Sequence, residues 1–153
     1  EKEAEIIVRE LKVEDSAAVA EMEQQIFSDS WSEKSVLETV QQKQSVCFAA
    51  EKAGHFLGYL LAYHAADEAE IARIAVQKEA RRQGAAGKLM QALEHYCEEH
   101  KMEKLLLDVR ESNEAARSFY TKNGFVEDGI RQGFYVNPSE DAVLMSRQLG
   151  ADV

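Results

Sequence analysis

The chain contains few of the features that divide a sequence into separate parts. Its 153 residues include a single proline, Pro138, and no Gly/Ser-rich linker, low-complexity tract or internal repeat. Segments that join domains are usually rich in such residues, so residues 1–153 are expected to form one domain. A multidomain machine is excluded, although the length is enough to bury one sizeable core.

Long apolar runs are also missing, and cysteine is scarce. No hydrophobic segment approaches the roughly 20 residues that cross a bilayer, and residues 1–9 do not have the pattern of a secretory signal. We therefore expect a cytoplasmic protein with no membrane partner. The two cysteines, Cys47 and Cys97, are expected to be small buried hydrophobic side chains rather than a disulfide.

Positive charge is in short supply. The chain has 18 Lys and Arg residues against 28 Asp and Glu, a formal net charge of −10. This charge repels nucleic-acid backbones at long range, so no direct nucleic-acid partner is expected. An acidic surface attracts amines and basic proteins, but it also serves solubility alone.

No group of side chains has the spacing of a metal site, because His95 and His100 do not share a helical face.

Hydrophobic periodicity predicts the order β-α-α-β-β-β-α-β-α-β-β. Strands are expected at residues 6–11, 46–51, 56–64, 70–76, 104–109, from 125, and 142–149, with helix starts near Asp15 or Ser16, at Ser32, after 87, and at Ser112 or Asn113. The strand at 104–109 is Leu-rich and is expected to be buried on both faces. A hairpin at 46–64 and a parallel crossover between 70 and 109 predict an α+β (mixed α/β) fold. Its central sheet is mixed and mostly antiparallel, with helices on both faces.

The most distinctive segment lies between a predicted strand and a predicted helix. It reads Arg81, Arg82, Gln83, Gly84, Ala85, Ala86, Gly87, Lys88. Small residues let a ligand approach the backbone, and the free N–H groups at a helix start bind anions such as phosphate. A Walker A loop would need Gly at 82 and Ser or Thr at 89, and G-x-G-x-x-G is absent. The alternative is a tight turn with solvated basic side chains.

This segment resembles the Gln/Arg-x-x-Gly-x-Gly/Ala motif of the GNAT acetyltransferase family. Arg81, Gly84 and Ala86 match the motif, and the order of elements resembles that family across essentially the whole chain. The resemblance implies a GNAT fold and acetyl-CoA as co-substrate, with its pyrophosphate on the loop amides and Lys88 beside it. It also implies that the pantetheine arm runs along the strand end, which consists of Ile74, Ala75 and Val76.

Two further groups of segments resemble one subfamily, which acetylates the amino-terminal alanine of a small-subunit ribosomal protein. The first group is Trp31–Lys34 and Leu107–Ala116, followed by Phe119–Tyr120 and Asn123–Phe125. The second group, near the end of the chain, is Gly133–Tyr135 with Glu140–Ala142. This likeness implies a partner that offers a protein or peptide amino terminus, with a ribosomal protein among the candidates. It implies direct transfer in a ternary complex, without a covalent acyl-enzyme.

The resemblance also implies roles for two candidate catalytic residues. It makes Asp108 the base that deprotonates the acceptor amine; the family usually has Glu there, and the shorter Asp favours a bridging water. The alternative is a structural carboxylate paired with Arg110. The resemblance makes Tyr120 the acid that protonates the departing thiolate, and the alternative for Tyr120 is packing beside Phe119.

Other roles follow from the same likeness. Asn113 is expected to cap its helix and to bind the cofactor arm. Trp31, Arg73 and Tyr135 are expected to form the substrate wall, although Arg73 stands where relatives often carry Asn. Two other functions stay open at this point: an acetyltransferase for small amines or lysine, and a CoA-binding sensor without catalysis.

Overall fold

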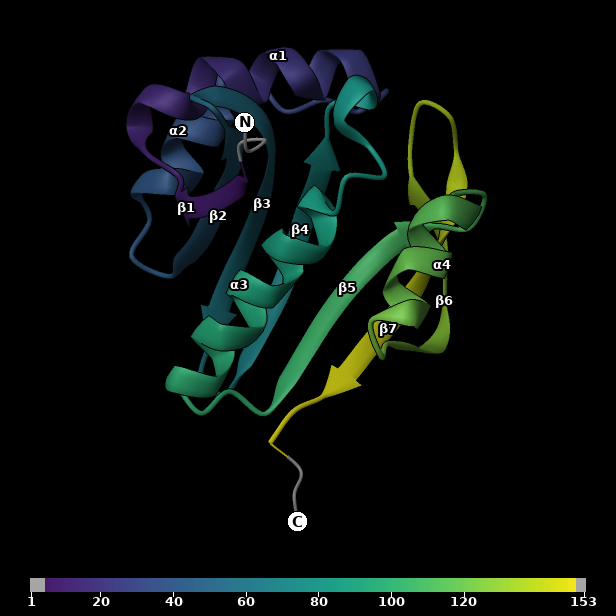
Figure 1. Ribbon diagram of the computed structural model, residues 1–153. Helices are drawn as coiled ribbons and strands as arrows, with labels where there is room; N and C mark the ends of the chain where they lie inside the picture. The colour runs from purple at the N-terminus through teal and green to yellow at the C-terminus, as the bar shows by residue number, and fades with distance from the viewer. Residues whose placement is uncertain (1–4, 151–153) are drawn as a thin grey trace.

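The computed structural model describes residues 5–150, so residues 1–4 and 151–153, the two ends of the predicted domain, lie outside it. Figure 1 shows its helices and strands. In chain order they are β1 (Ile6–Glu10), a 3-10 turn (Val13–Asp15), α1 (Ser16–Ile26), α2 (Glu33–Gln41), β2 (Ser45–Lys52), β3 (His55–Ala65), β4 (Glu68–Val76), a second 3-10 turn (Lys78–Ala80), α3 (Ala85–Glu99), β5 (Lys104–Arg110), α4 (Glu114–Lys122), β6 (Val126–Tyr135) and β7 (Glu140–Gln148). This order confirms the predicted one.

The strands form one seven-stranded sheet in the order β1-β2-β3-β4-β5-β7-β6. Every neighbouring pair is antiparallel except β4 and β5, which are parallel and are joined through α3. A crossover helix is the usual way to connect parallel neighbours. The predicted α+β fold with a mixed, mostly antiparallel sheet is therefore confirmed.

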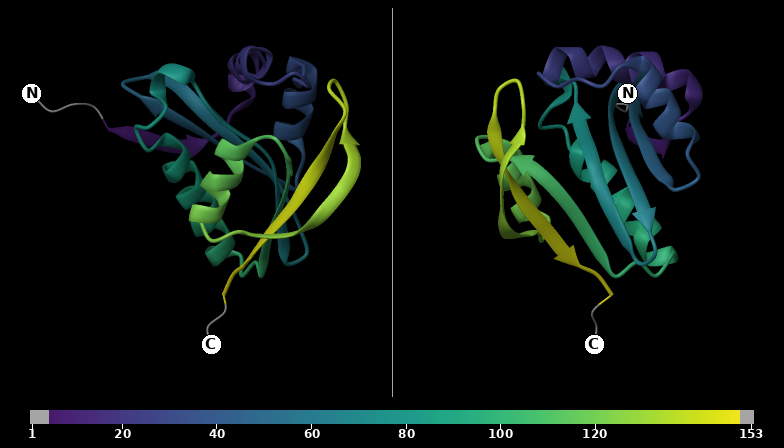
Figure 2. Two further views of the ribbon diagram at one scale, coloured as in Figure 1. Left: turned by 90° about the vertical axis from the view of Figure 1, so that its right-hand side faces the viewer. Right: turned by 180° about the vertical axis from the view of Figure 1, so that it is seen from behind.

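Helices cover the two faces of the sheet. Successive side chains of a strand point to opposite faces, so Val46 and Ala50 of β2 pack with α3 while Cys47 and Ala49 pack with α1 and α2. Figure 1 shows α3 and α4 in front of the sheet, and the reverse view in Figure 2 shows the strands in front of α3. Both cysteines are buried and free, as expected. Cys97 belongs to the α3 side and Cys47 to the α1 and α2 side, so the two lie on opposite faces of the sheet.

Two details of the sequence-based expectations are wrong. In β5 only Leu105, Leu107 and Val109 are buried, and the alternate residues are partly exposed. The reason is that the core under α1 and α2 draws its strand residues from β2, β3 and β4, which leaves that face of β5 uncovered. The other detail is that no side chain caps α1; Asp15 instead accepts a hydrogen bond from the backbone N–H of Lys12.

The sheet splits between its two parallel strands. Residues Glu68–Ile71 of β4 pair with Lys104–Leu107 of β5, and the pairing stops there. Beyond this point the carboxyl ends of the two strands diverge, as Figure 1 shows. The edge of β4 that faces the split, from Ala72 to Val76, thus has backbone groups that β5 does not use. Unpaired backbone groups of this kind are available to bind a ligand.

A glycine on β3 allows β4 to approach closely at this position. A Cβ atom on Gly58 would collide with the carbonyl oxygen of Ala75 and would lie 3.0 Å from the Cα of Val76. Both neighbours are backbone atoms, so they cannot yield by changing a rotamer. Gly58 therefore fixes the position of β4 beside the split.

We expect Gly58→Ala to lower the free energy of unfolding by about 1–3 kcal/mol, because a methyl group in a filled space forces the backbone to shift. Urea unfolding measures this change. Gly129→Ala is the matched control, since a Cβ on Gly129 meets nothing within 4 Å. Equal stability of the two variants would contradict the close approach of β3 and β4.

Candidate active site

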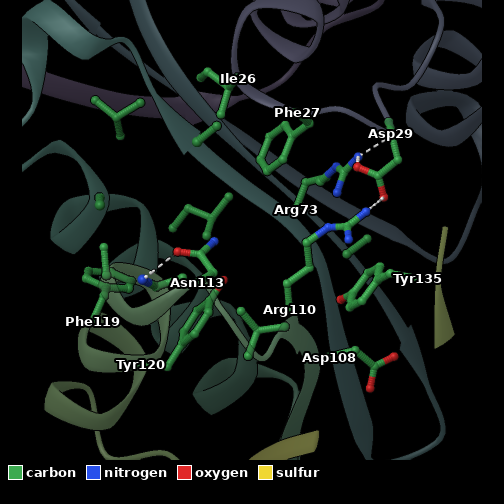
Figure 3. A pocket seen from close by; sticks show the side chains of 18 of the residues that line it. Ile26, Phe27, Asp29, Arg73, Asp108, Arg110, Asn113, Phe119, Tyr120 and Tyr135 are labelled. Carbon is green, nitrogen blue, oxygen red and sulfur yellow. Dashed lines mark hydrogen bonds and ion pairs between the residues drawn. The ribbon is translucent and has the colours of Figure 1, made fainter. Parts of the chain in front are cut away.

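A cleft of about 520 Å³ opens where β4 and β5 diverge. Residues from β4, β5, α1, α4, the α1–α2 connection and the loop before α3 line it, and Figure 3 shows most of them. The predicted site residues among them are Arg73, Ile74, Ala75, Val76, Arg81, Ala86, Asp108, Asn113, Tyr120 and Tyr135. Residues as far apart in the chain as Arg73 and Tyr135 thus meet in one cavity.

The loop before α3 has the backbone shape of an anion-binding turn. Arg82 and Gly84 both have positive φ, 68° and 88°, and α3 begins at Ala85. The first N–H groups of a helix have no carbonyl one turn earlier, so those of residues 85–87 have no partner within the helix. Together with the helix dipole they favour a phosphate group. Arg81 stabilises the loop, because its Nε donates to the Val76 carbonyl at 3.2 Å.

Six residues of the predicted loop lie outside the lining of the cleft: Arg82, Gln83, Gly84, Ala85, Gly87 and Lys88. The Lys88 ammonium group points toward β1, where its Nζ donates to the Ile6 carbonyl at 3.4 Å. The Gln83 amide donates to the Glu79 carbonyl. Lys88 and Gln83 are therefore engaged within the protein, whereas Arg81 and Ala86 of this segment line the cleft.

Tyr120 packs beside Phe119, which is one of the two roles that the sequence left open, and it also lines the cleft. Its ring packs edge-on against Phe119 and Phe125 with centroids 5.6 and 5.5 Å away, and the residue is only 6% exposed. The Tyr120 hydroxyl makes no hydrogen bond within residues 5–150. It is not among the fully buried polar side-chain atoms without a partner there, which include only the Ser16 hydroxyl, so it is open to the cleft. Burial, together with nearby Tyr135, raises the pKa of Tyr120 far above its ordinary value. The phenol is therefore protonated at neutral pH.

Asp108 lies on the uncovered face of β5 and reaches the cleft (Figure 3). The sequence left open a pair between Asp108 and Arg110, but the structure places Arg110 elsewhere. The Arg110 guanidinium pairs with Glu140 at 3.3 Å and Asp29 at 3.9 Å. Asp108 makes no ion pair within the described part of the chain. Its negative charge contributes to the raised pKa of Glu70, so it faces that side chain too.

Asn113 lies at the start of α4, on the wall of the cleft. Its side-chain oxygen accepts a hydrogen bond from the Ala116 N–H at 3.1 Å, which confirms the predicted helix cap. The amide nitrogen makes no hydrogen bond to any residue between 5 and 150. Its two N–H groups are therefore available to a ligand while the oxygen keeps the cap in place.

A buried carboxylate behind the cleft holds Arg73. Glu23 of α1 is 0% exposed and accepts hydrogen bonds from the Tyr59 hydroxyl at 2.6 Å and the Trp31 N–H at 3.0 Å. Its third partner is Arg73, whose Nε donates to it at 3.1 Å. Burying a charge is costly unless it is paired and hydrogen-bonded, and here three donors satisfy it.

Asp29 links the two sides of the split. One of its carboxylate oxygens accepts a hydrogen bond from Arg73 of β4 at 3.1 Å, and the other lies 3.9 Å from Arg110 of β5. Figure 3 shows Asp29 between the two guanidinium groups. Arg110 also stacks over the Tyr135 ring at 4.5 Å. The α1–α2 connection, both edges of the split and β6 are thereby held together at one mouth of the cleft.

Two of the three predicted wall residues reach the cleft. Arg73 and Tyr135 line it, whereas Trp31 does not; Trp31 lines a second, shallow pocket and stands 5.8 Å from the Arg73 guanidinium. Burial, with the negative charges of Asp108 and Asp29, raises the pKa of Tyr135 to about 12. Because Trp31 lies near the Arg73 guanidinium but outside the lining of the cleft, it packs near Arg73 without facing the cavity.

Glu23 and Asp29 were not among the predicted site residues. A usable signal existed for Glu23, because it follows Val19 by four residues and thus lies on the apolar stripe of α1 with Met22 and Ile26. A carboxylate on a buried stripe demands a partner. Asp29 gives no such signal, because it lies in a connection between helices and its importance depends on contacts across the fold.

Two features are absent from residues 5–150. No helix there is long and apolar enough to span a membrane. No cluster of three or more His, Cys, Asp or Glu side chains is arranged to hold a metal ion.

Comparison with known proteins gives the same family throughout. The model of the acetyltransferase (GNAT) family matches residues 16–125. The chain is 30% identical over 141 residues to the ribosomal protein bS18-alanine N-acetyltransferase of Escherichia coli (strain K12), covering 91% of this chain and 95% of that one.

Solved structures agree. The crystal structure of the ribosomal-protein-S18-alanine N-acetyltransferase from Escherichia coli superposes with a TM-score of 0.89 at 28% identity, covering 97% of both chains. The PaiA N-acetyltransferase from Thermoplasma acidophilum, solved in complex with coenzyme A, superposes with a TM-score of 0.78 at 20% identity over 94% of this chain and 99% of that one. The second likeness concerns the fold alone. With a family match over residues 16–125 and a relative at 30% identity, the chain belongs to the GNAT family and is an N-acetyltransferase.

Proposed function

We propose that the protein transfers the acetyl group of acetyl-CoA to the α-amine at the amino terminus of a polypeptide, with alanine as the preferred first residue and a ribosomal protein as the acceptor. The observation that carries this proposal is the position of the Tyr120 hydroxyl and the Asp108 carboxylate in one cleft at the split of the sheet. The relative from Escherichia coli, named for ribosomal protein bS18-alanine, supports the choice of acceptor.

The loop and the β4 edge fit acetyl-CoA. The free N–H groups at the start of α3 suit its pyrophosphate, and the unpaired edge at Ala72–Val76 suits the amides of its extended arm. Ala86 lines the cleft at the point where the backbone must approach closely, and the free amide of Asn113 reaches the same cavity. When bound, acetyl-CoA supplies the reactive thioester.

In this proposal Asp108 accepts the proton that the amine loses, directly or through one water, and Tyr120 gives its proton to the sulfur of the leaving group. The ordinary pKa of a thiol, near 8.5, lies below that of a phenol. Burial raises the pKa of Tyr120 further, so the phenol still carries its proton when negative charge develops on the sulfur. The N–H groups near Ala75 and Val76 provide donors for the oxygen that becomes negative during transfer.

An α-amine needs little help to become a nucleophile. With a reference pKa near 7.8, about 14% of it is free base at pH 7, against about 0.04% for lysine, a roughly 400-fold advantage. Neither Cys47 nor Cys97 lines the cleft, so neither can carry the acetyl group there. This supports direct transfer within a ternary complex.

The decisive test mixes the purified protein with acetyl-CoA and a short alanine-initiated peptide. We expect release of free thiol and a peptide whose mass spectrum places one acetyl group on the α-amine. A panel of peptides with a blocked amino terminus and a free lysine, and of polyamines, identifies the acceptor class. Preferential transfer to lysine or polyamines would refute the proposed acceptor, and cofactor binding without transfer to any amine would refute the activity.

The pH dependence of kcat/KM should have one rising limb. The acceptor must be free base, so the rate should increase through the amine pKa of about 7.8 and then level off. Because burial raises the pKa of Tyr120, loss of its proton should not produce a falling limb below about pH 10, the ordinary value for a phenol. Initial rates between pH 6 and 10 measure the profile. A falling limb near pH 8 or 9 would contradict a buried tyrosine as the acid.

A further inference from the structure

Arg73 is oriented by fixed partners on its two sides. Its Nε donates to the buried Glu23, and its Nη2 donates to the backbone carbonyl and the carboxylate of Asp29 at 2.7 and 3.1 Å. The Phe27 ring lies 4.0 Å from the centre of the guanidinium. The side chain is 12% exposed. A guanidinium held in this way keeps one orientation, because its donors form a rigid planar fork.

The third nitrogen of the fork, Nη1, has no such partner. It makes no hydrogen bond within residues 5–150. A fully buried nitrogen without a partner would belong with the Ser16 hydroxyl, which is the one buried, unpartnered side-chain atom of those residues, and Nη1 does not. Nη1 is therefore accessible, and Arg73 lines the cleft. Tyr120 and Tyr135 line the same cleft as Arg73.

The chemistry of the neighbourhood selects the partner of Nη1. Glu23 and Asp29 already balance the charge of Arg73, and Asp108 adds a further negative charge to the cleft. A further carboxylate, on the substrate, would be repelled here. A neutral oxygen that accepts a hydrogen bond therefore fits Nη1 better. An α-amine carries such an atom close by, since the carbonyl of the first residue is bonded to the same carbon as the nitrogen. A lysine ε-amine or a polyamine has no carbonyl at that place.

We propose that Arg73 is a specificity-determining residue, whose Nη1 donates a hydrogen bond to the carbonyl oxygen of the acceptor's first residue and thereby selects α-amines. Glu23 and Tyr59 are positioning residues. Glu23 accepts the hydrogen bond from Arg73, and Tyr59 donates to Glu23, so both act on the acceptor only through Arg73. This inference rests on the proposed function, which supplies the amine acceptor.

The test compares two acceptors that differ in the carbonyl. An alanine-initiated peptide has it, and 2-aminopropane has the same amine carbon with a methyl group in its place. The double variant Glu23→Gln, Arg73→Met removes the fork without leaving a buried charge. We expect the KM for the peptide to rise about tenfold, as for loss of one hydrogen bond to a charged group. The ratio of kcat/KM for the peptide to kcat/KM for 2-aminopropane should therefore fall about tenfold. The KM for acetyl-CoA should stay within twofold.

Arg73→Lys separates the donor from the charge. Lysine keeps a positive charge beside Glu23, but its single ammonium nitrogen cannot bind Glu23, Asp29 and the acceptor carbonyl at once, as the three guanidinium nitrogens can. The KM for the peptide should therefore rise by a similar factor. Arg117→Gln, on the exposed side of α4, is the matched control and should leave both acceptors unaffected. Equal losses for peptide and 2-aminopropane, or an unchanged KM for the peptide in either Arg73 variant, would overturn the inference.

A binding measurement keeps the inference separate from the activity. Calorimetry with the wild-type protein, saturated with coenzyme A, gives the Kd of the peptide without any transfer. About tenfold weaker binding to the double variant supports the role of Arg73, even if the wild type acetylates no amine and the proposed function fails. Equal binding to both proteins overturns the inference, even if the proposed function holds.

Discussion

Tyr120→Phe should lower kcat for acetyl transfer by about 100-fold to 10,000-fold, which is the usual contribution of a positioned general acid or base. The substitution removes only the hydroxyl. The ring remains between Phe119 and Phe125, where most of the residue is buried, so the fold and the cleft keep their shape. Steady-state rates with an alanine-initiated peptide measure the change.

The affinity for coenzyme A separates catalysis from binding in this experiment. We expect the Kd of coenzyme A, measured by calorimetry, to change less than threefold, because a lost proton donor removes an interaction that matters only during the reaction. Tyr63→Phe is a suitable control, since Tyr63 lies outside the main cleft and binds Thr39. A Tyr120→Phe protein with normal kcat would show that the thiolate leaves without a proton from this residue.

Arg73→Met alone should lower the free energy of unfolding by about 3–5 kcal/mol. The variant leaves the carboxylate of Glu23, which is 0% exposed, without its cationic partner. Breaking a buried ion pair on one side is far more costly than replacing both partners. Urea unfolding followed by circular dichroism measures the loss.

The double variant Glu23→Gln, Arg73→Met should recover most of this loss. The glutamine amide introduced at position 23 can still accept from the Trp31 N–H through its oxygen and can donate to the Tyr59 hydroxyl through its nitrogen, because the two partners bind different oxygens of Glu23. No charge is then left in the core. Arg117→Met, in an exposed ion pair with Glu127, should cost less than about 1 kcal/mol. If Arg73→Met is no worse than Arg117→Met, then Glu23 is not held as a buried charge.

Much of the fold follows from patterns that are local in the chain. Alternating residues predict the strands, and Ser32 and Asn113 predict helix starts that the structure confirms through side-chain caps. The small residues Gly84 to Gly87 indicate a loop for an anion because the conformational freedom of such a segment depends on its own composition. The family resemblance added the expected roles of Asp108 and Tyr120.

Other features depend on the tertiary structure. The split between β4 and β5 ends their pairing at Ile71 and Leu107, and no local pattern marks that point. The split determines which backbone groups of β4 stay free and which face of β5 stays uncovered. The same holds for Trp31, which is predicted in the substrate wall and which lines a second pocket, with its ring 5.8 Å from the Arg73 guanidinium.

The sequence by itself determined the order of elements, the small-residue loop before α3 and the types of residue available for acid and base chemistry. Only the tertiary structure decided that Glu23, Arg73 and Asp29 form one cluster, because these residues lie on three separate segments that meet after the sheet and α1 have packed together. Local preferences act over a few residues, whereas pairing of buried charges depends on which surfaces the whole chain brings into contact.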